Sequence, residues 1–439
     1  MNHNETMSDY KGKQKESCRL ASPWSWVPTL YFAEAIPYMA VMTLSVIMYT
    51  NMGLSNTELA LYTSWLYLPW VIKPLWSPIV DAMKTKRWWI LSMQVLVGAS
   101  LAGVALTLNA SWWLRGSLCF FWLMAFSSAT HDIAADGFYI LGLSEKEQAL
   151  FVGVRSTFYR VGTIFCQGLV VVLAGYLESR CSVPYAWSLT MTFMAAIMLA
   201  MAAWHKFSVK KVESDVPIQS DSAHRGLRGL LYAFVDTLKA FFTRPAIVPA
   251  LLFMLFFRFP EAQLVKMAQP FMLRPIEEGG LELGTITVGY TYGTVGVIAL
   301  LAGGLLGGWL VSRNGLRRWW WPMVFSISIP DAVYIYLALA QPSNLWIING
   351  CVAMEQFGYG FGFTAYSLFL VYFARGEKST SVFSICTAFQ ALGMMIPGMF
   401  AGMLADRMGF AHFFIFVVIC CAVTFVVSAL VKVEGRRVL

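Results

Sequence analysis

Two aspartates, Asp132 and Asp136, lie four residues apart inside a long apolar stretch of the sequence. This spacing places both carboxylates on one face of a helix. Ionisable groups in the hydrocarbon region of a membrane cost a few kcal/mol unless paired or hydrated, so they mark candidate functional sites. Counted at about 1.5 Å per helical residue, Arg155 and Arg160 lie at matching depths in the next apolar stretch. The sequence therefore predicts two ion pairs, Asp136–Arg155 and Asp132–Arg160.

Each predicted pair has a structural and a functional interpretation. The pair of Asp136 and Arg155 could join two helices and close an inner gate, or it could take part in coupling, and the sequence leaves both open. For the deeper Asp132 and Arg160 we favour a role with substrate or a coupling proton, since arginine is a good partner for carboxylate and phosphate groups. His131 points about 100° away from Asp132 around the helix, and we expect a satisfied polar neighbour there.

Other ionisable residues fall near the middle of apolar stretches, and buried glutamates of this kind can carry protons. The candidates for proton coupling are Asp132, Glu34, Glu261 and Glu355. The candidates for substrate binding are Arg160, Arg258, Gln356 and Tyr159. For Asp331 a structural role is favoured.

The composition is that of a polytopic membrane protein. Of the 439 residues, 58% are hydrophobic and only 13% are charged, whereas about a quarter of a soluble domain is charged. A membrane-spanning helix needs about 20 apolar residues. Twelve segments qualify, so we expect an all-α membrane protein: 24–50, 57–80, 88–107, 113–141, 148–177, 184–206, 245–273, 284–311, 319–340, 344–372, 381–404 and 410–432.

The distribution of Lys and Arg predicts the orientation. The net charge is +8, and the basic residues gather in the tails and in alternate loops. The other loops hold only Arg180, Arg274 and Arg407. This positive-inside bias places both termini in the cytoplasm and argues against a nucleic-acid surface. The first 20 residues lack the apolar core of a cleaved signal peptide, so we expect a multi-pass protein of the inner membrane.

The chain divides into two halves. We expect a cytoplasmic tail (1–22), a six-helix bundle (23–206), a cytoplasmic linker (207–244), a second six-helix bundle (245–432) and a second tail (433–439). The linker carries apolar residues at helical spacing, which predicts an amphipathic helix at the membrane surface or under the bundle. These residues are Leu227, Leu230, Leu231, Phe234, Val235, Leu238 and Phe241.

Short echoes relate the two halves. "FAEA" at 32–35 returns as "FPEA" at 259–262, which pairs Glu34 with Glu261. "HDIAADGF" at 131–138 returns as "MEQFGYGF" at 354–361, which pairs Asp132 with Glu355. Repeats in order at nearly constant offset indicate duplication. Two parallel repeats around a central site are typical of transporters that work by alternating access.

Two resemblances refine this prediction. "SPIVDAMKTKRWW" at 77–89 resembles the signature loop of the major facilitator superfamily. That resemblance implies a cytoplasmic gate, to which Asp136 and Arg155 could also belong; its residues would be Asp81, Lys84, Lys86, Arg87, Arg317 and Arg318. In the second half, Ser312 stands where the first has Asp81. The stretches 73–78, 131–162 and 354–393 are similar to the AmpG-type muropeptide permeases, through D-I-x-x-D and the arginine before a glycine in the next span.

The resemblance implies proton-coupled import of peptidoglycan-derived muropeptides. We expect a monomer in the lipid bilayer that takes a small, anionic solute and needs no cofactor besides a proton gradient. The alternative solutes are a siderophore or a coenzyme-A ester. A non-transporting sensor or a membrane enzyme is disfavoured, because no loop offers a nucleophile with its base. The eight cysteines form no C-x-x-C pair, so we expect no metal site.

Overall fold

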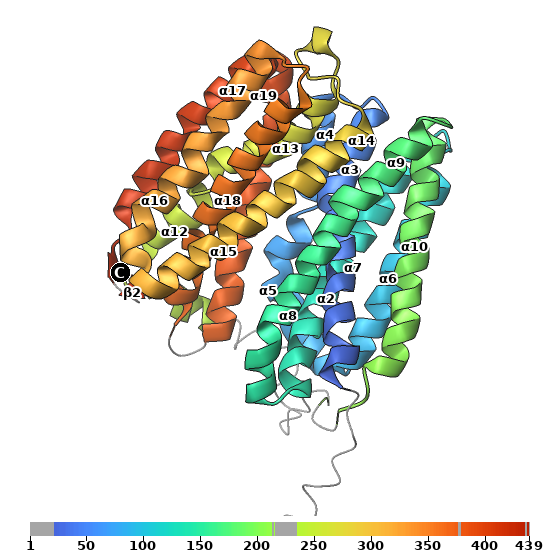
Figure 1. Ribbon diagram of the computed structural model, residues 1–439. Helices are drawn as coiled ribbons and strands as arrows, with labels where there is room; N and C mark the ends of the chain where they lie inside the picture. The colour runs from blue at the N-terminus through green and yellow to red at the C-terminus, as the bar shows by residue number, and fades with distance from the viewer. Residues whose placement is uncertain (1–21, 213–214, 216–234, 376–378, 435–436, 439) are drawn as a thin grey trace, which may run out of the picture.

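The computed structural model describes residues 22–212, 215, 235–375, 379–434 and 437–438. Within these residues the chain is almost entirely helical, and only β1 (Val433–Glu434) and β2 (Arg437–Val438) form a short antiparallel pair. Two helical bundles stand beside each other in Figure 1, the first coloured blue to green and the second yellow to red. The predicted all-α membrane fold is therefore confirmed.

The first bundle contains six predicted spans, several of them broken into shorter helices. In chain order the elements are η1 (Pro23–Ser25), α2 (Val27–Met39), η2 (Ala40–Leu44) and α3 (Ser45–Asn51); α4 (Asn56–Trp65) and α5 (Leu68–Met83); α6 (Lys86–Thr107); α7 (Trp113–Gly142); α8 (Glu145–Ile164), η3 (Phe165–Val170) and α9 (Val171–Glu178); and α10 (Val183–Ser208).

The second bundle is built in the same way. Its elements are α12 (Ile247–Phe256) and α13 (Phe259–Leu273); the loop helix η4 (Ile276–Glu278); α14 (Thr285–Val288), η5 (Gly289–Gly296) and α15 (Val297–Asn314); α16 (Leu316–Ser328), η6 (Ile329–Ala332) and α17 (Val333–Ala340); α18 (Leu345–Ala374); and α19 (Ser379–Leu430).

Ten described helical stretches are long and apolar enough to cross a membrane, against twelve predicted segments. The difference has two physical causes. The chain bends at Leu66 and Tyr67, just before Pro69, so α4 and α5 are each too short to count alone. The last stretch, 381–430, holds two predicted spans that meet at Gly409 (φ 73°), a backbone conformation that glycine adopts without steric cost.

Breaks within spans place polar groups at mid-depth. Span seven is interrupted at Phe257 and Arg258, directly before Pro260, and span nine becomes a 3-10 turn at Pro330. Proline has no N–H to donate to the preceding turn, which weakens the helix there. Segments η2, η3 and η5 are π-helical, a form that recurs at functional sites.

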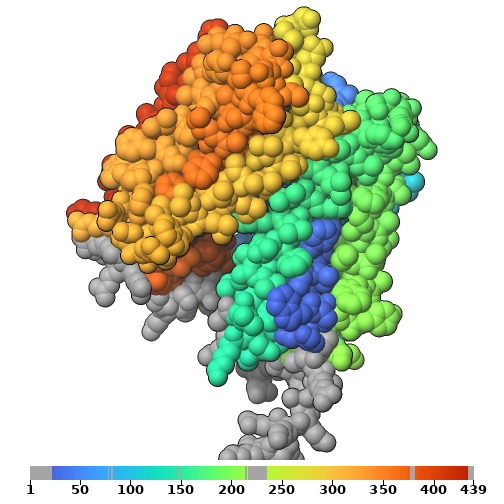
Figure 2. All heavy atoms as spheres, viewed as in Figure 1, coloured from blue at the N-terminus to red at the C-terminus, as the bar shows by residue number. Residues whose placement is uncertain are grey.

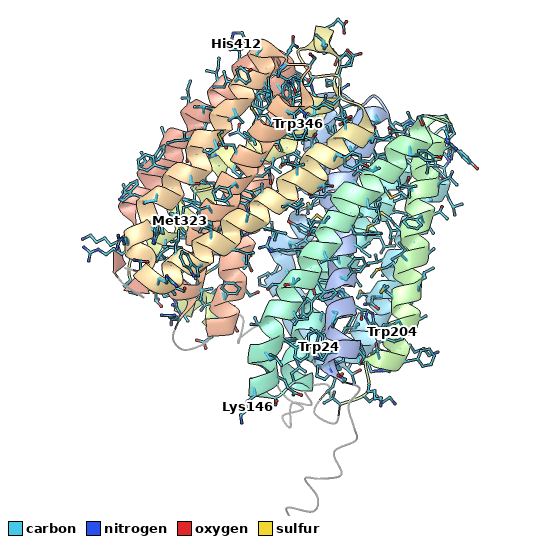
Figure 3. All side chains as sticks on the ribbon, in the orientation of Figure 1. Trp24, Lys146, Trp204, Met323, Trp346 and His412 are labelled. Carbon is cyan, nitrogen blue, oxygen red and sulfur yellow. The ribbon has the colours of Figure 1, made fainter. Side chains whose placement is uncertain are left out.

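Exposed tryptophans mark both ends of the molecule. Trp24 and Trp204 lie near one end, and Trp346, with 86% of its surface exposed, lies towards the other (Figure 3). Such residues are enriched at the two membrane–water interfaces. We call the end near Trp24, where the linker joins the bundles, the linker end, and the opposite one the far end.

The two bundles are bonded to each other at the far end. The Asp406 carboxylate accepts hydrogen bonds from Asn56 Nδ2 (2.8 Å) and from the backbone N–H (2.7 Å) and hydroxyl (2.6 Å) of Thr57. Thr285 donates to Glu178 and accepts from Asn51 Nδ2 (2.8 Å). Segments α9 and η3 also pack on α14 and η5, where green meets yellow in Figure 2. The structure is thus closed at the far end.

Two glycines permit the closest of these approaches, and one is Gly402 of α19, where an added Cβ would lie 1.8 Å from the carbonyl oxygen of Asn56 in α4. A Cβ atom at Gly293 would lie 1.8 Å from the carbonyl oxygen of Gln167, across the contact between η5 and η3. Small residues at such positions let helix backbones touch inside a membrane.

The linker helix lies only partly within the described residues. Leu227, Leu230, Leu231 and Phe234 fall outside them, so the amphipathic prediction stands untested there. Residues 235–242 are helical, and Phe241 is fully buried against Phe373 and Phe389 (ring centroids 5.9 and 5.6 Å). The end of the linker is therefore docked on the second bundle.

Candidate functional site

The paired aspartates of α7 meet two cations, one of which the sequence analysis missed. Asp132 forms an ion pair with Lys73 of α5, both side chains being about a quarter exposed or less. Asp136 forms an ion pair with Arg155 of α8 at 2.7 Å. Lys73 lies in the stretch "KPLWSP", whose family resemblance was a signal that it mattered. Matching depths between consecutive spans does not detect this pair, because α5 packs against α7 although α6 lies between them in the chain.

The predicted pairing of Asp132 with Arg160 is wrong. Arg160, on α8, makes no hydrogen bond or ion pair with any residue that the structure describes. Lys73 lies beside Asp132 instead. Matching residues by depth along the two spans therefore predicted the partner of Asp136 correctly and the partner of Asp132, one turn deeper, incorrectly. Tyr159, the neighbour of Arg160, lies within electrostatic range of Glu34 and Asp132.

Aromatic rings hold Arg155 in place. Its guanidinium carbon lies 4.6 Å from the ring centre of Tyr31 and 5.4 Å from that of Tyr139. The Tyr31 hydroxyl donates to Asp136 at 3.3 Å. The side chains of Asp136 and Arg155 are 41% and 32% exposed, so this pair lies at the margin of the bundle. Such exposure fits a contact that exchanges partners.

Glu34 of α2 completes the first polar cluster. Its side chain is buried, its carboxyl adjoins that of Asp132, and one of its oxygens has no hydrogen-bond partner. Three carboxyl groups and two cations therefore form the cluster Glu34–Asp132–Lys73–Asp136–Arg155. One proton would balance its charge.

His131 belongs to a separate chain of polar groups on the other face of α7. Its Nε2 lies 3.0 Å from Gln94 Nε2, the Gln94 oxygen lies 3.0 Å from His205 Nδ1, and His205 Nε2 lies 3.0 Å from the Thr29 hydroxyl. All four residues are on helices of the first bundle. The chain agrees with the expected role of His131 as a hydrogen-bonded polar neighbour.

Two cations of the second bundle lie near the contact between the halves. Arg258, at the break before α13, donates to the Tyr359 hydroxyl and lies 4.9 Å from the Phe363 ring centre. Lys266 donates to the hydroxyl of Thr63 in the first bundle at 3.0 Å. A small cavity lies between the halves, lined by Met42, Val46, Tyr67, Ala262, Val265, Lys266 and Met394.

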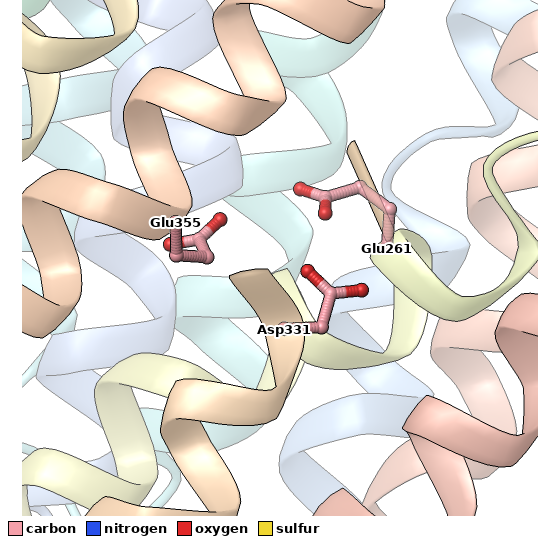
Figure 4. A group of neighbouring side chains, drawn as sticks. All are labelled: Glu261, Asp331 and Glu355. Carbon is pink, nitrogen blue, oxygen red and sulfur yellow. The ribbon is translucent and has the colours of Figure 1, made fainter. Parts of the chain in front are cut away.

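Three carboxyl groups converge in the second bundle (Figure 4). Glu261 comes from the first turn of α13, Asp331 from the turn η6 and Glu355 from α18. Gln356 donates to Glu355 at 3.0 Å and to the Tyr292 hydroxyl at 3.2 Å. Glu261 and Glu355 were predicted separately as candidates for proton coupling and Asp331 as structural, and no pattern in the sequence indicated that all three meet.

Comparison with known proteins identifies the family. A profile of the Major Facilitator Superfamily matches residues 29–398. The chain belongs to the Major Facilitator Superfamily. It is therefore a membrane transporter rather than an enzyme, as the sequence predicted.

The sequence relatives narrow this assignment. The chain is 25% identical to "Putative transporter AmpG 4" of Rickettsia felis, over 83% of this chain and 86% of the relative. It is also 25% identical to "Anhydromuropeptide permease" of Escherichia coli K12, over 79% and 67% of the two chains. These matches confirm the expected resemblance to AmpG permeases.

Solved structures support the fold alone. A D-xylose–proton symporter superposes with a TM-score of 0.71 at 12% identity, covering 94% of this chain and 98% of the symporter. The nucleoside transporter NupG superposes with a TM-score of 0.69 at 15% identity, covering 92% and 99%.

The superfamily's signature loop is tied to the linker. Arg87 donates to the carbonyl oxygens of Val209 (2.6 Å) and Lys206 (2.8 Å), and the backbone N–H groups of Lys86 and Arg87 donate to Asp215 (2.6 and 3.0 Å). Lys84, Arg317 and Arg318 are exposed, and the Asp81 side chain lies outside the described part of the structure. The gating role of these residues stays a prediction.

Proposed function

We propose that this transporter imports peptidoglycan-derived muropeptides in symport with protons. Both termini would lie in the cytoplasm, and the protein would act as a monomer in the inner membrane. The observation that carries the proposal is the cluster Glu34–Asp132–Lys73, in which the buried carboxyl of Glu34 and the partly exposed carboxyl of Asp132 adjoin and share one lysine. The AmpG names of the relatives support the choice of substrate.

Charge balance suggests how a proton would be coupled. Lys73 compensates one negative charge, so the second carboxyl of Glu34 and Asp132 is satisfied when it holds a proton. Loss of that proton would leave an uncompensated negative charge among membrane-spanning helices, where such a charge is energetically costly. The halves would then favour a state in which this cluster reaches water or a cationic group. Rocking of one half against the other would expose the cluster to each side in turn.

The cations between the halves suit an anionic solute. Arg160 has no partner among the described residues, and Arg258 donates to a neutral hydroxyl rather than to a carboxylate. A guanidinium offers a planar fork of donors that matches carboxylate groups. Muropeptide carboxylates would meet these side chains, with Tyr159 and Gln356 as neutral neighbours.

Uptake into proteoliposomes tests the proposal. We expect labelled anhydromuropeptide to accumulate only with an inwardly directed proton gradient, and Asp132→Asn to abolish accumulation while exchange without a gradient persists. Glu277→Gln removes the same charge from an exposed residue and is the matched control. Gradient-driven uptake that survives in Asp132→Asn would show that this aspartate is structural. No uptake by folded wild-type protein would exclude the substrate, and a siderophore or coenzyme-A ester would be tested next.

A further inference from the structure

The second bundle buries three carboxyl groups in one place. Glu261, Asp331 and Glu355 are each 1% exposed, and one oxygen from each lies within 4.8 Å of the others. In Figure 4 their carboxyl groups point towards a common centre from three separate elements. A buried carboxyl group is tolerated in a protein when it is paired, coordinates a cation or holds a proton.

Their hydrogen bonds leave most of this charge uncompensated. Neither oxygen of Glu261 has a hydrogen-bond partner in the described part of the chain. Asp331 faces only the Cys421 thiol, a weak donor, at 3.6 Å. Glu355 accepts from Gln356, a neutral amide, at 3.0 and 3.2 Å.

A fourth oxygen lies beside Glu355. The Tyr334 hydroxyl is fully buried, lies near Glu355, and makes no hydrogen bond within the usual limits. Arg258 acts electrostatically on Glu261, but its guanidinium donates to the Tyr359 hydroxyl. The centre therefore combines three carboxyl groups and an unpartnered hydroxyl with one nearby, already engaged cation.

We propose that Glu261, Asp331, Glu355 and Tyr334 form a binding site for a hard metal cation of sodium or calcium size. The donors are all oxygens, which suit alkali and alkaline-earth ions rather than soft transition metals. Calcium–oxygen distances of about 2.3–2.6 Å allow oxygens around one ion to lie up to about 5 Å apart, so three oxygens within 4.8 Å of one another can contact a single ion.

The backbone around this centre suits a cation as well. Asp331 lies in the 3-10 turn of a broken helix, and Glu261 follows a break in span seven. Broken helices in transporters free backbone carbonyls that coordinate cations near the membrane midplane. The site goes beyond the proposed proton coupling, and it does not depend on which solute is carried.

Thermal unfolding of the purified protein in detergent tests the site. NaCl and CaCl₂ would each be titrated against choline chloride at constant ionic strength, without any muropeptide. Because a ligand that binds only the folded state stabilises it, we expect a saturable rise in Tm with at least one of the two metal ions. The rise should be lost in Asp331→Asn and in Glu355→Gln, and kept in Asp132→Asn, which changes a partly exposed carboxylate of the other bundle.

Direct binding of radiolabelled sodium and calcium gives the second readout on the same variants. If one variant does not purify as a monodisperse protein, the other still decides. Absence of saturable binding, or binding that survives both variants, would overturn the site. Stabilisation by acid alone, with no response to either metal ion, would overturn it too and leave the cluster a store of protons. None of these results depends on muropeptide uptake, so the proposed transport function can fail or hold separately.

Discussion

At the residue scale, Lys73 is the side chain on which the first cluster depends. Removing it leaves Asp132 beside Glu34 with no cation in contact. We expect Lys73→Gln to destabilise the protein by about 2 kcal/mol, less than the loss of a fully buried ion pair because both side chains are partly exposed. The double variant Lys73→Gln/Asp132→Asn should recover much of this loss. A double-mutant cycle of thermal unfolding measures it, and additive effects would contradict the pair.

Arg160 offers the opposite case, a cation that forms no ion pair or hydrogen bond with the residues that the structure describes. We expect Arg160→Gln to raise the KM for an anionic solute about tenfold, since a hydrogen bond to a charged group contributes roughly 1.5–3 kcal/mol. Its Tm should stay within a degree or two of wild type. Arg155→Gln is the matched comparison, because it breaks an ion pair and should lower Tm as well. Unchanged KM in Arg160→Gln would remove it from the binding site.

About half of the polar contacts described above could be predicted from the sequence. Counting depth along spans four and five found Asp136 and Arg155, because consecutive helices are neighbours in space. It could not find Lys73, because its partner Asp132 comes from a span that is not adjacent in the chain, and it missed the cluster around Asp331 because Glu261 lies two spans away. The sequence offered two signals for them: Lys73 is a single lysine in an apolar segment, and Pro330 and Asp331 form a Pro–Asp pair within span nine.

At the element scale, Asp406 of α19 caps a helix in the other bundle. Its carboxylate binds the first turn of α4, where free N–H groups and the helix dipole favour negative charge. We expect Asp406→Asn to weaken the closed far end by about 0.5–2 kcal/mol. That is roughly a two- to thirtyfold shift in the ratio of closed to open molecules.

Distances between spin labels on the far-end loops of the two bundles measure this shift. Glu277→Gln, which changes an exposed carboxylate at the same end, should leave the distance distribution unchanged. An unchanged distribution in Asp406→Asn would mean that backbone packing alone holds this end closed.

The helices themselves were largely predictable, and their interruptions were not. Apolar length and the repeat located every span, because a membrane demands about 20 apolar residues whatever the packing. The π-helical segments η2, η3 and η5 carry no proline, and they depend on contacts such as that of Gly293 with Gln167. Those contacts join residues far apart in sequence, so no local pattern reports them.

At the scale of the whole molecule, the two halves share a plan and differ in charge. Glu34 and Asp132 of the first half correspond by repeat to Glu261 and Glu355 of the second. The first pair is joined by a cation, Lys73, and the second by another acid, Asp331. Both halves thus contain an acidic centre, and within the described residues only the first centre includes a cation in an ion pair, whereas Arg258 acts on the second from a distance. This asymmetry is a reason to assign the two centres different ligands.

Orientation in the membrane is a prediction for the whole molecule. The excess of Lys and Arg at the linker end places that end in the cytoplasm. We expect alkaline phosphatase fused after Leu439 to be inactive and the same enzyme inserted at Glu277 to be active, because it folds only outside the cytoplasm. A fluorescent protein at the two positions should give the reverse pattern. Activity at Leu439 would invert the topology.

The cap on α4 also makes the first turn of that helix a natural reporter. Asp406 belongs to one bundle and the amide of Thr57 to the other, so the bond at 2.7 Å can exist only while the bundles touch there. Each opening of the far end would uncover this amide to solvent deuterium, whereas amides in the middle of α4 would stay protected. The hydrogen–deuterium exchange rate of this one amide would then report how often the far end of the transporter opens, without any attached label.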